Sequence, residues 1–296
     1  MRGGENFNSI GDYLKEHFGK KTVKLSIEAG FTCPNRDGTK GFGGCAFCSE
    51  GGSGELASSI GEQIDLLSSK WPDAEYIAYF QSHTNTYAPV EILREKFYSA
   101  LNDPRIKGIA IATRPDCLGD DVLDLLDEIN SKYFLWLELG LQTIHPKTSE
   151  LLNIGYDLSC YDKATSELRK RNIKFVTHLI LGLPGETKED MFESVKYVCE
   201  SGIWGIKLHL LNIIKGSRLY EMMPDYVPFE SIDEYTDLVV SLLEIIPPEV
   251  TIHRLTGDVP RSLLVAPEWS YRKRTILNEI NRKLKESSTH QGSALQ

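Results

Sequence analysis

The 296-residue sequence lacks a long apolar run, since no stretch approaches the roughly 18 uninterrupted apolar residues of a membrane-spanning helix. Its first eight residues, Met-Arg-Gly-Gly-Glu-Asn-Phe-Asn, contain no apolar core and no small-residue cleavage site. We therefore expect no secretory signal and a cytoplasmic protein. In that reducing compartment the six cysteines are expected to be ligands, nucleophiles or core residues rather than disulfides.

The sequence also lacks an excess of positive charge. The formal net charge is -9, which excludes a whole surface built for nucleic acid but allows a local basic patch. Residues 261–286 carry seven Lys or Arg against three Glu. The sequence contains no repeat and no low-complexity tract, and its apolar (41%) and charged (25%) fractions match those of globular domains.

Apolar, β-forming runs alternate along the chain with helical patterns. The runs cover residues 23–27, 76–80, 108–113, 134–141, 174–181 and 206–214, with a later candidate at 250–255. Helical periodicity covers residues 90–101, 120–131, 161–171, 188–201 and 232–246. Six βα units in this order predict a partial (βα)6 TIM-like barrel of parallel strands, with a doubly wound sheet as the alternative. Either fold places the active site at the carboxyl ends of the strands.

This pattern divides the chain into three parts. Residues 1–22 form an N-terminal segment and residues 23–247 form the barrel. Residues 248–296 form a C-terminal helical extension, with a basic helix near 269–286 and a flexible tail.

The most informative motif is a group of three cysteines after the first strand: Cys33, Cys45 and Cys48. Two cysteines three positions apart can direct both sulfurs to one centre, and the third arrives through a glycine-rich loop that bends easily. Three thiolates leave one coordination position open. A [4Fe-4S] cluster and a zinc site both fit this pattern, whereas three thiols in a flexible loop are harder to explain by packing.

The Cys-x11-Cys-x2-Cys motif and the six βα units resemble a radical S-adenosylmethionine (radical SAM) enzyme. Further segments, at residues 32–38, 79–87, 112–116, 138–143 and 181–187, resemble the YhcC/YtqA-like bacterial group, which is related to the radical SAM domain of the Elongator catalytic subunit. The resemblance runs from about residue 6 to about residue 280. It implies one [4Fe-4S] cluster, S-adenosylmethionine bound to the open iron, and cleavage of that cofactor to a 5′-deoxyadenosyl radical.

The resemblance also implies roles for individual residues. The cluster ligands are Cys33, Cys45 and Cys48, and no residue is assigned a catalytic role. The cofactor contacts are Phe47, Gln81, Ser82, Thr84, Glu138, Gln142 and His178. The substrate contacts are Arg114, His209, Lys215, Arg272, Lys273 and Arg274. Ile154 stands where relatives carry an arginine that reaches the cofactor carboxylate, so either another cation compensates or that contact is absent.

Relatives in this branch act on the wobble uridine of tRNA. The resemblance therefore implies tRNA as substrate, with the uridine C5 side chain changed from carboxymethylaminomethyl to aminomethyl, and an electron donor such as flavodoxin or ferredoxin. The C-terminal basic segment, with Lys20, Lys21 and Lys24, could hold phosphates. The alternatives are a radical SAM enzyme for a small metabolite or porphyrin, and a non-catalytic zinc- or iron-binding interaction protein. No membrane partner is expected.

Overall fold

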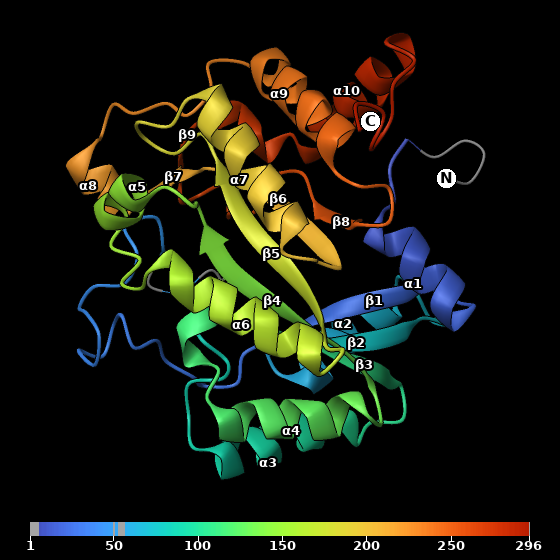
Figure 1. The fold of residues 1–296 in the computed structure, drawn as a ribbon. Helices are drawn as coiled ribbons and strands as arrows, with labels where there is room; N and C mark the ends of the chain where they lie inside the picture. The colour runs from blue at the N-terminus through green and yellow to red at the C-terminus, as the bar shows by residue number, and fades with distance from the viewer. Residues whose placement is uncertain (1–5, 50, 53–56, 296) are drawn as a thin grey trace.

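The structure is a computed structural model that describes residues 6–49, 51–52 and 57–295. Its main sheet has seven strands, all parallel, in the order β1-β2-β3-β4-β5-β6-β8. The sheet curls into a partial barrel with helices on its outer side (Figure 1). This confirms the predicted fold class and excludes the doubly wound alternative. The strands are β1 (Thr22–Ile27), β2 (Glu75–Phe80), β3 (Ile106–Thr113), β4 (Phe134–Gln142), β5 (Lys174–Leu181), β6 (Gly205–Leu210) and β8 (Thr251–Arg254).

Most of the predicted helices lie where the periodicity placed them. They are α3 (Val90–Leu101), α4 (Asp120–Asn130), α6 (Leu158–Lys170), α7 (Lys188–Glu200), α9 (Ile232–Ile245) and α10 (Lys273–Glu286). Each buries apolar residues in the main core, α10 by packing on α9, and α7 begins with a reciprocal cap between Thr187 and Asp190. The short helices α1 (Ile10–Phe18), α2 (Ile60–Ser68), α5 (Pro146–Leu151) and α8 (Arg218–Met222) were not predicted.

The end of the barrel departs from the sequence prediction in two respects. The run at 206–214 is not one strand, because β6 ends at Leu210 and Ile213–Ile214 forms β7, which pairs antiparallel with β9 (Leu264–Ala266). The strand β8, which lies in the region assigned to the extension, pairs with β6 and is part of the main sheet. The C-terminal region therefore contributes directly to the barrel wall.

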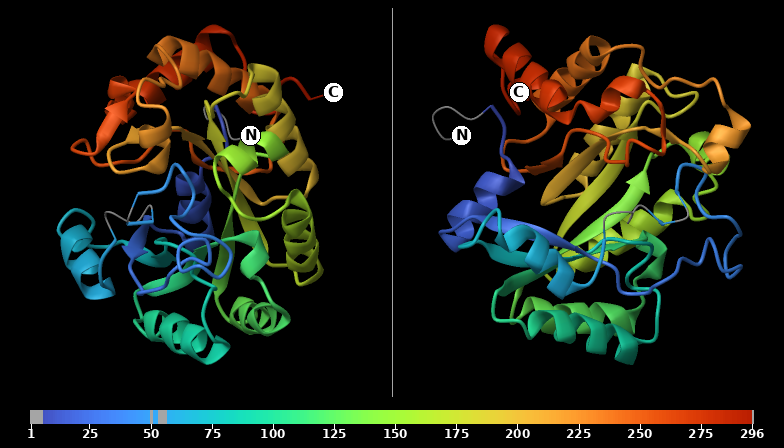
Figure 2. Two further views of the ribbon diagram at one scale, coloured as in Figure 1. Left: turned by 90° about the vertical axis from the view of Figure 1, so that its left-hand side faces the viewer. Right: turned by 180° about the vertical axis from the view of Figure 1, so that it is seen from behind.

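The sheet stays open between its two edge strands, β1 and β8, and helix α1 lies against both of them. The Ile252 amide donates to the Asn8 carbonyl at 2.7 Å, and Leu14 packs in an apolar cluster with Trp136. The curl and its outer helices are visible end-on in the left view of Figure 2. Thus α1 covers the amino-terminal end of the barrel and leaves the carboxyl end for a site.

The expected flexible tail is held in place by hydrogen bonds. Gln291 is 1% exposed; its side chain donates to the carbonyls of Pro247 and Val250 and accepts from the Asn8 amide. Helices α9 and α10 pack side by side over this region (Figure 1). The two ends of the described chain are therefore joined near the edge strand β8.

Candidate active site

The cysteine loop lies between β1 and α2, at the carboxyl end of the barrel. Cys33, Cys45 and Cys48 are half-buried free thiols that line one pocket. Backbone hydrogen bonds fold the loop back on itself: the Cys48 amide donates to the Cys45 carbonyl at 3.0 Å, and the Gly44 amide to the Asn35 carbonyl at 2.8 Å. Gly43 and Gly44 have φ angles of 78° and 77°, which glycine adopts without strain.

The donor set fits both metal hypotheses, since a zinc ion and a [4Fe-4S] cluster each bind cysteine thiolates. A hydrogen bond with Cys48 and burial raise the pKa of Cys45, so metal binding there must displace a proton.

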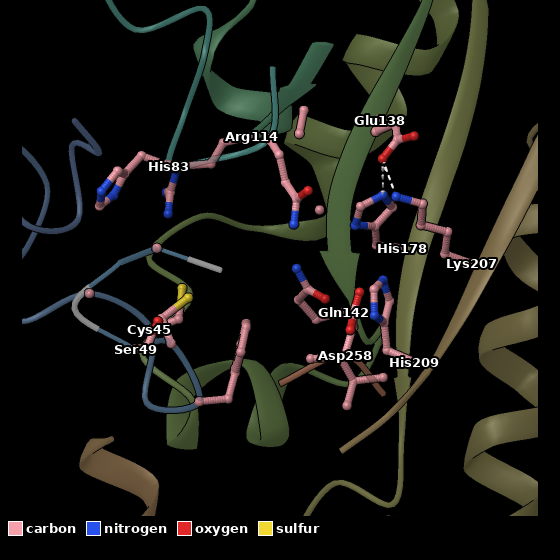
Figure 3. Close-up of a pocket in the computed structure, with 18 of the residues that line it drawn as sticks. Cys45, Ser49, His83, Arg114, Glu138, Gln142, His178, Lys207, His209 and Asp258 are labelled. Atoms are coloured by element: carbon pink, nitrogen blue, oxygen red, sulfur yellow. Dashed lines mark hydrogen bonds and ion pairs between the residues drawn. The ribbon is translucent and has the colours of Figure 1, made fainter. Parts of the chain in front are cut away.

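A charged trio lies beside the cysteines. The Arg114 guanidinium donates to Asp116 through Nε at 2.9 Å and Nη2 at 3.0 Å, and Lys40 Nζ lies 2.6 Å from the same carboxylate. Arg114 Nη1 also donates to the Ile154 carbonyl at 2.8 Å. The structure therefore places the Arg114 guanidinium against the backbone of Ile154. Arg114 lines the pocket, but on its cysteine side (Figure 3).

A second charged trio fills the opposite wall, around Glu138 of β4. This carboxylate is fully buried and forms an ion pair with Lys207 of β6, and its Oε1 lies 3.7 Å from Lys24 Nζ. It also accepts hydrogen bonds from Tyr79 (2.6 Å) and Trp136 (3.1 Å). Burial opposes ionisation, but Lys207 and Lys24 outweigh it and hold the pKa of Glu138 well below its usual range. Lys24, which was predicted to contact phosphate, instead pairs with the buried Glu138 inside the barrel.

Two histidines on β5 and β6 lie next to this trio. His178 Nε2 lies 3.0 Å from Glu138, and the His178 and His209 rings are 5.0 Å apart. Burial and the nearby Lys207 charge lower the pKa of His178 to about 4, and burial lowers the pKa of His209 well below its usual value. Both imidazoles are therefore neutral at physiological pH.

A third charged trio joins the pocket to the C-terminal extension. Arg254, at the end of β8, lies 3.1 Å from Asp258, which also forms an ion pair with Lys273 at the start of α10. Arg254 and Asp258 line the pocket, whereas Lys273 lies outside it. The extension therefore supplies part of the pocket wall.

The remaining predicted cofactor residues are mostly in the pocket. Phe47, Gln81, Thr84 and Gln142 line it, and Gln81 accepts from Ser26 at 3.1 Å. Gln142 follows a register shift in β4 and has a φ of 75°, an unusual conformation for a residue with a side chain. Ser82 is buried but does not line the pocket.

The predicted substrate residues separate into two groups. Arg114 and His209 line the pocket. The other four, Lys215, Arg272, Lys273 and Arg274, do not line it. Of these, Lys215, Arg272 and Arg274 are exposed.

Several residues of the pocket were not found from the sequence: Tyr79, Tyr156, Lys207, Arg254 and Asp258. A signal for one of them was present. Lys207 lies two residues before His209 in an apolar strand, so the period of two places both side chains on the same face of the sheet. The others depend on contacts between distant parts of the chain.

A parallel half-barrel with three cysteines on the loop after β1, all lining one pocket at the carboxyl end, defines a metallocluster enzyme of the TIM-barrel type. Two family models match the chain: the Radical SAM superfamily over residues 32–198 and the Radical_SAM C-terminal domain over residues 203–286. The chain belongs to the radical SAM superfamily. It therefore uses a [4Fe-4S] cluster and S-adenosylmethionine and needs an electron donor.

Individual relatives agree with this assignment. The protein YtqA of Bacillus subtilis is 44% identical over 99% of this chain and 94% of its own length. The tRNA uridine(34) acetyltransferase of Methanocaldococcus jannaschii is 27% identical over 54% of this chain and 30% of its own. The structure of Elp3 from the archaeon Methanocaldococcus infernus superimposes with a TM-score of 0.66 at 18% identity, covering 78% of this chain and 58% of that one. In the described part of the chain, no helix has the length and apolar character to cross a membrane.

Proposed function

We propose that Cys33, Cys45 and Cys48 hold a single [4Fe-4S] cluster and that S-adenosylmethionine binds beside it in the pocket. The observation that carries this proposal is that the three cysteines line the same cavity as Phe47, Gln81, Thr84 and Gln142. When bound, the cluster and the cofactor supply a 5′-deoxyadenosyl radical that takes a hydrogen atom from the substrate. The protein's own contribution is to bind, orient and exclude water.

Each pocket residue has a physical role in this scheme. The thiolates fix three irons, and Phe47 offers an apolar face for the adenine. Gln142 offers an amide with both donor and acceptor atoms, held in the pocket by the shift in β4. Arg114 supplies a positive charge on the cysteine side, where the relatives' arginine is replaced by Ile154.

We further propose that the substrate is tRNA and that the reaction changes a carboxymethylaminomethyl side chain at C5 of the wobble uridine to aminomethyl. Loss of a hydrogen atom from the carbon beside the nitrogen and of one electron to the oxidised cluster would give an imine, which water would hydrolyse to the amine and glyoxylate. The tRNA uridine(34) acetyltransferase, a partial match to this chain, supports a tRNA substrate. The exposed Arg272 and Arg274 also support it, because they flank Lys273, whose ion pair with Asp258 ties this basic segment to the pocket wall. The wobble base would have to be splayed out to enter the pocket.

The cluster assignment is tested by chemical analysis after anaerobic reconstitution. Alanine at Cys33, Cys45 or Cys48 should abolish stoichiometric binding of iron and labile sulfide, because each thiolate anchors one iron. Cys199→Ala is the matched control: Cys199 packs against the main core from α7, so iron content should stay at the wild-type level. Full iron content in Cys45→Ala would refute the assignment.

The substrate assignment is tested by mass spectrometry of tRNA nucleosides from cells with and without the protein. Loss of the protein should cause the carboxymethylaminomethyl nucleoside to accumulate at the expense of the aminomethyl form. An unchanged nucleoside profile, with S-adenosylmethionine cleavage still observed in vitro, would favour a small-metabolite substrate instead.

A further inference from the structure

The three charged trios around the pocket share one arrangement: each consists of one carboxylate between two cations. Asp116 lies between Arg114 and Lys40, Glu138 between Lys207 and Lys24, and Asp258 between Arg254 and Lys273. Arg114, Lys207 and Arg254 line the pocket, whereas Lys40, Lys24 and Lys273 are not part of its lining. Although the chain has a net charge of -9, each trio thus contributes one cation to the pocket.

The proposed function already explains the cations of the first trio. Arg114 lies on the cysteine side of the pocket and interacts electrostatically with Cys33 and Cys45, where thiolates and a cluster would carry negative charge. The trios of Glu138 and Asp258 lie in the opposite wall, as Figure 3 shows for Glu138, Lys207 and Asp258. The two cations of that wall that line the pocket each have a carboxylate partner: Lys207 pairs with Glu138, and Arg254 pairs with Asp258.

Two polar atoms of uncharged side chains in the same wall lack a hydrogen-bond partner among the described residues. His209 Nε2 and Asn212 Oδ1 are buried and have no hydrogen-bond partner in the described part of the chain. Both residues line the pocket. Orphaned polar atoms of this kind mark a place where a ligand or an ordered water is expected. Only His209 Nε2 can donate to an anion, because Asn212 Oδ1 is an acceptor that suits a donor group such as an amine.

We propose that this wall is an anion subsite that binds a carboxylate of the substrate, with Arg254 as its ion partner. Arg254 suits this role better than Lys207, whose ammonium group is 2% exposed and bonded to Glu138 and Tyr79. The Arg254 side chain is 23% exposed, and its one described bond engages Nη2 alone. The remaining guanidinium donors can face a carboxylate.

This inference rests on the proposed function and adds a specificity determinant to it. A carboxymethylaminomethyl side chain carries a carboxylate, whereas the aminomethyl product does not. An anion subsite would therefore distinguish substrate from product by charge. The carboxylate would be held on the wall that faces the cysteines across the pocket, which orients the adjacent carbon toward the cluster side.

The test measures equilibrium binding by calorimetry, using cluster-loaded protein with S-adenosylmethionine and no reductant. One pair of probes is 5-carboxymethylaminomethyluridine and its carboxamide analogue. A second pair, N-methylglycine and N-methylglycinamide, carries the side-chain fragment without any nucleoside. Wild type should prefer the charged member of each pair by roughly tenfold or more, as expected for a charge-assisted contact. Arg254→Gln should reduce that preference to near unity, and Arg254→Lys should retain part of it.

Arg261→Gln is the matched control, because Arg261 stacks on Tyr271 at 4.3 Å and does not line the pocket. This variant should keep the wild-type preference. Equal binding of charged and neutral probes to wild type, or no binding of any probe, would overturn the anion subsite. A preference that requires Arg254, together with an unchanged tRNA profile in cells, would retain the subsite and refute the tRNA substrate. Equal binding of charged and neutral probes, together with an altered tRNA profile in cells that lack the protein, would retain the tRNA substrate and refute the subsite.

Discussion

The pocket wall and helix α10 arrange their charges in opposite ways. In the pocket, a carboxylate such as Glu138 lies between two cations. On α10, a cation lies between two carboxylates: Arg282 pairs with Glu279 and Glu286, and Lys283 with Asp233 and Asp237. The most basic segment of the sequence is therefore partly neutralised at the surface, whereas two lysines of an acidic protein gather around one buried carboxylate. Local charge follows from tertiary contacts and not from the charge of a segment.

The strongest test of this contrast removes the central carboxylate of a buried trio. Glu138→Gln should lower the free energy of unfolding by about 3–5 kcal/mol, because two ammonium groups are left without their counter-ion. Denaturant titration of the reconstituted protein measures the effect. A double replacement, Glu138→Met with Lys207→Met, should recover part of the loss, since it removes a charge together with its partner. Equal stability of wild type and Glu138→Gln would show that the trio is not an ionised unit.

A pH titration sharpens the contrast, because burial and, after it, the Lys207 charge keep His178 neutral. Its pKa is about 4 in the folded protein, against about 6.5 when unfolded, so the unfolded chain binds more protons between these values. Stability from this source is present above pH 6.5 and is lost as the pH falls toward 4. His178→Gln should remove about 2–3 kcal/mol of that dependence. Parallel curves for wild type and variant between pH 7.5 and 4.5 would contradict the lowered pKa.

The third test concerns the basic residues at the start of α10. Replacing both Arg272 and Arg274 with Ala should reduce the slope of log affinity against log salt for tRNA by roughly 1.4–1.8, at 0.7–0.9 per phosphate contact. Lys273→Ala should change the slope less, because Lys273 is paired with Asp258. Salt titrations of tRNA binding decide the matter. Identical slopes for wild type and the double variant would remove this segment from the RNA site.

The smallest effect is expected on the exposed face of α10. Arg282→Ala should leave both the denaturant midpoint and the tRNA salt slope within experimental scatter, because solvent screens its pairs with Glu279 and Glu286. A measurable loss of tRNA affinity in this variant would show that the basic character of the whole helix matters, rather than its first turn alone.

The barrel and the cysteine motif were predictable because they depend on local patterns. The apolar runs identified the strands, and three cysteines within sixteen residues identified the metal-binding loop. The trios were not predictable in this way. Lys24, Glu138 and Lys207 belong to three strands far apart in the sequence, and only the curl of the sheet brings their side chains together.

Other differences have equally specific causes. The run at 206–214 looked continuous because periodicity does not reveal where a strand leaves the sheet, which happens here after Leu210. Gln142 lines the pocket as expected, but the register shift between Gly140 and Gln142, which periodicity does not reveal, sets its backbone conformation. Arg254 was missed because its strand, β8, was assigned to the extension.

The contact between α1 and β8 also has a consequence for the order in which the protein is made. The Asn8 carbonyl accepts from the Ile252 amide, and the Asn8 amide donates to Gln291. During translation, helix α1 leaves the ribosome more than two hundred residues before either partner exists. The amino-terminal end of the barrel is therefore sealed last, after the cysteine loop and six of the seven strands have been synthesised.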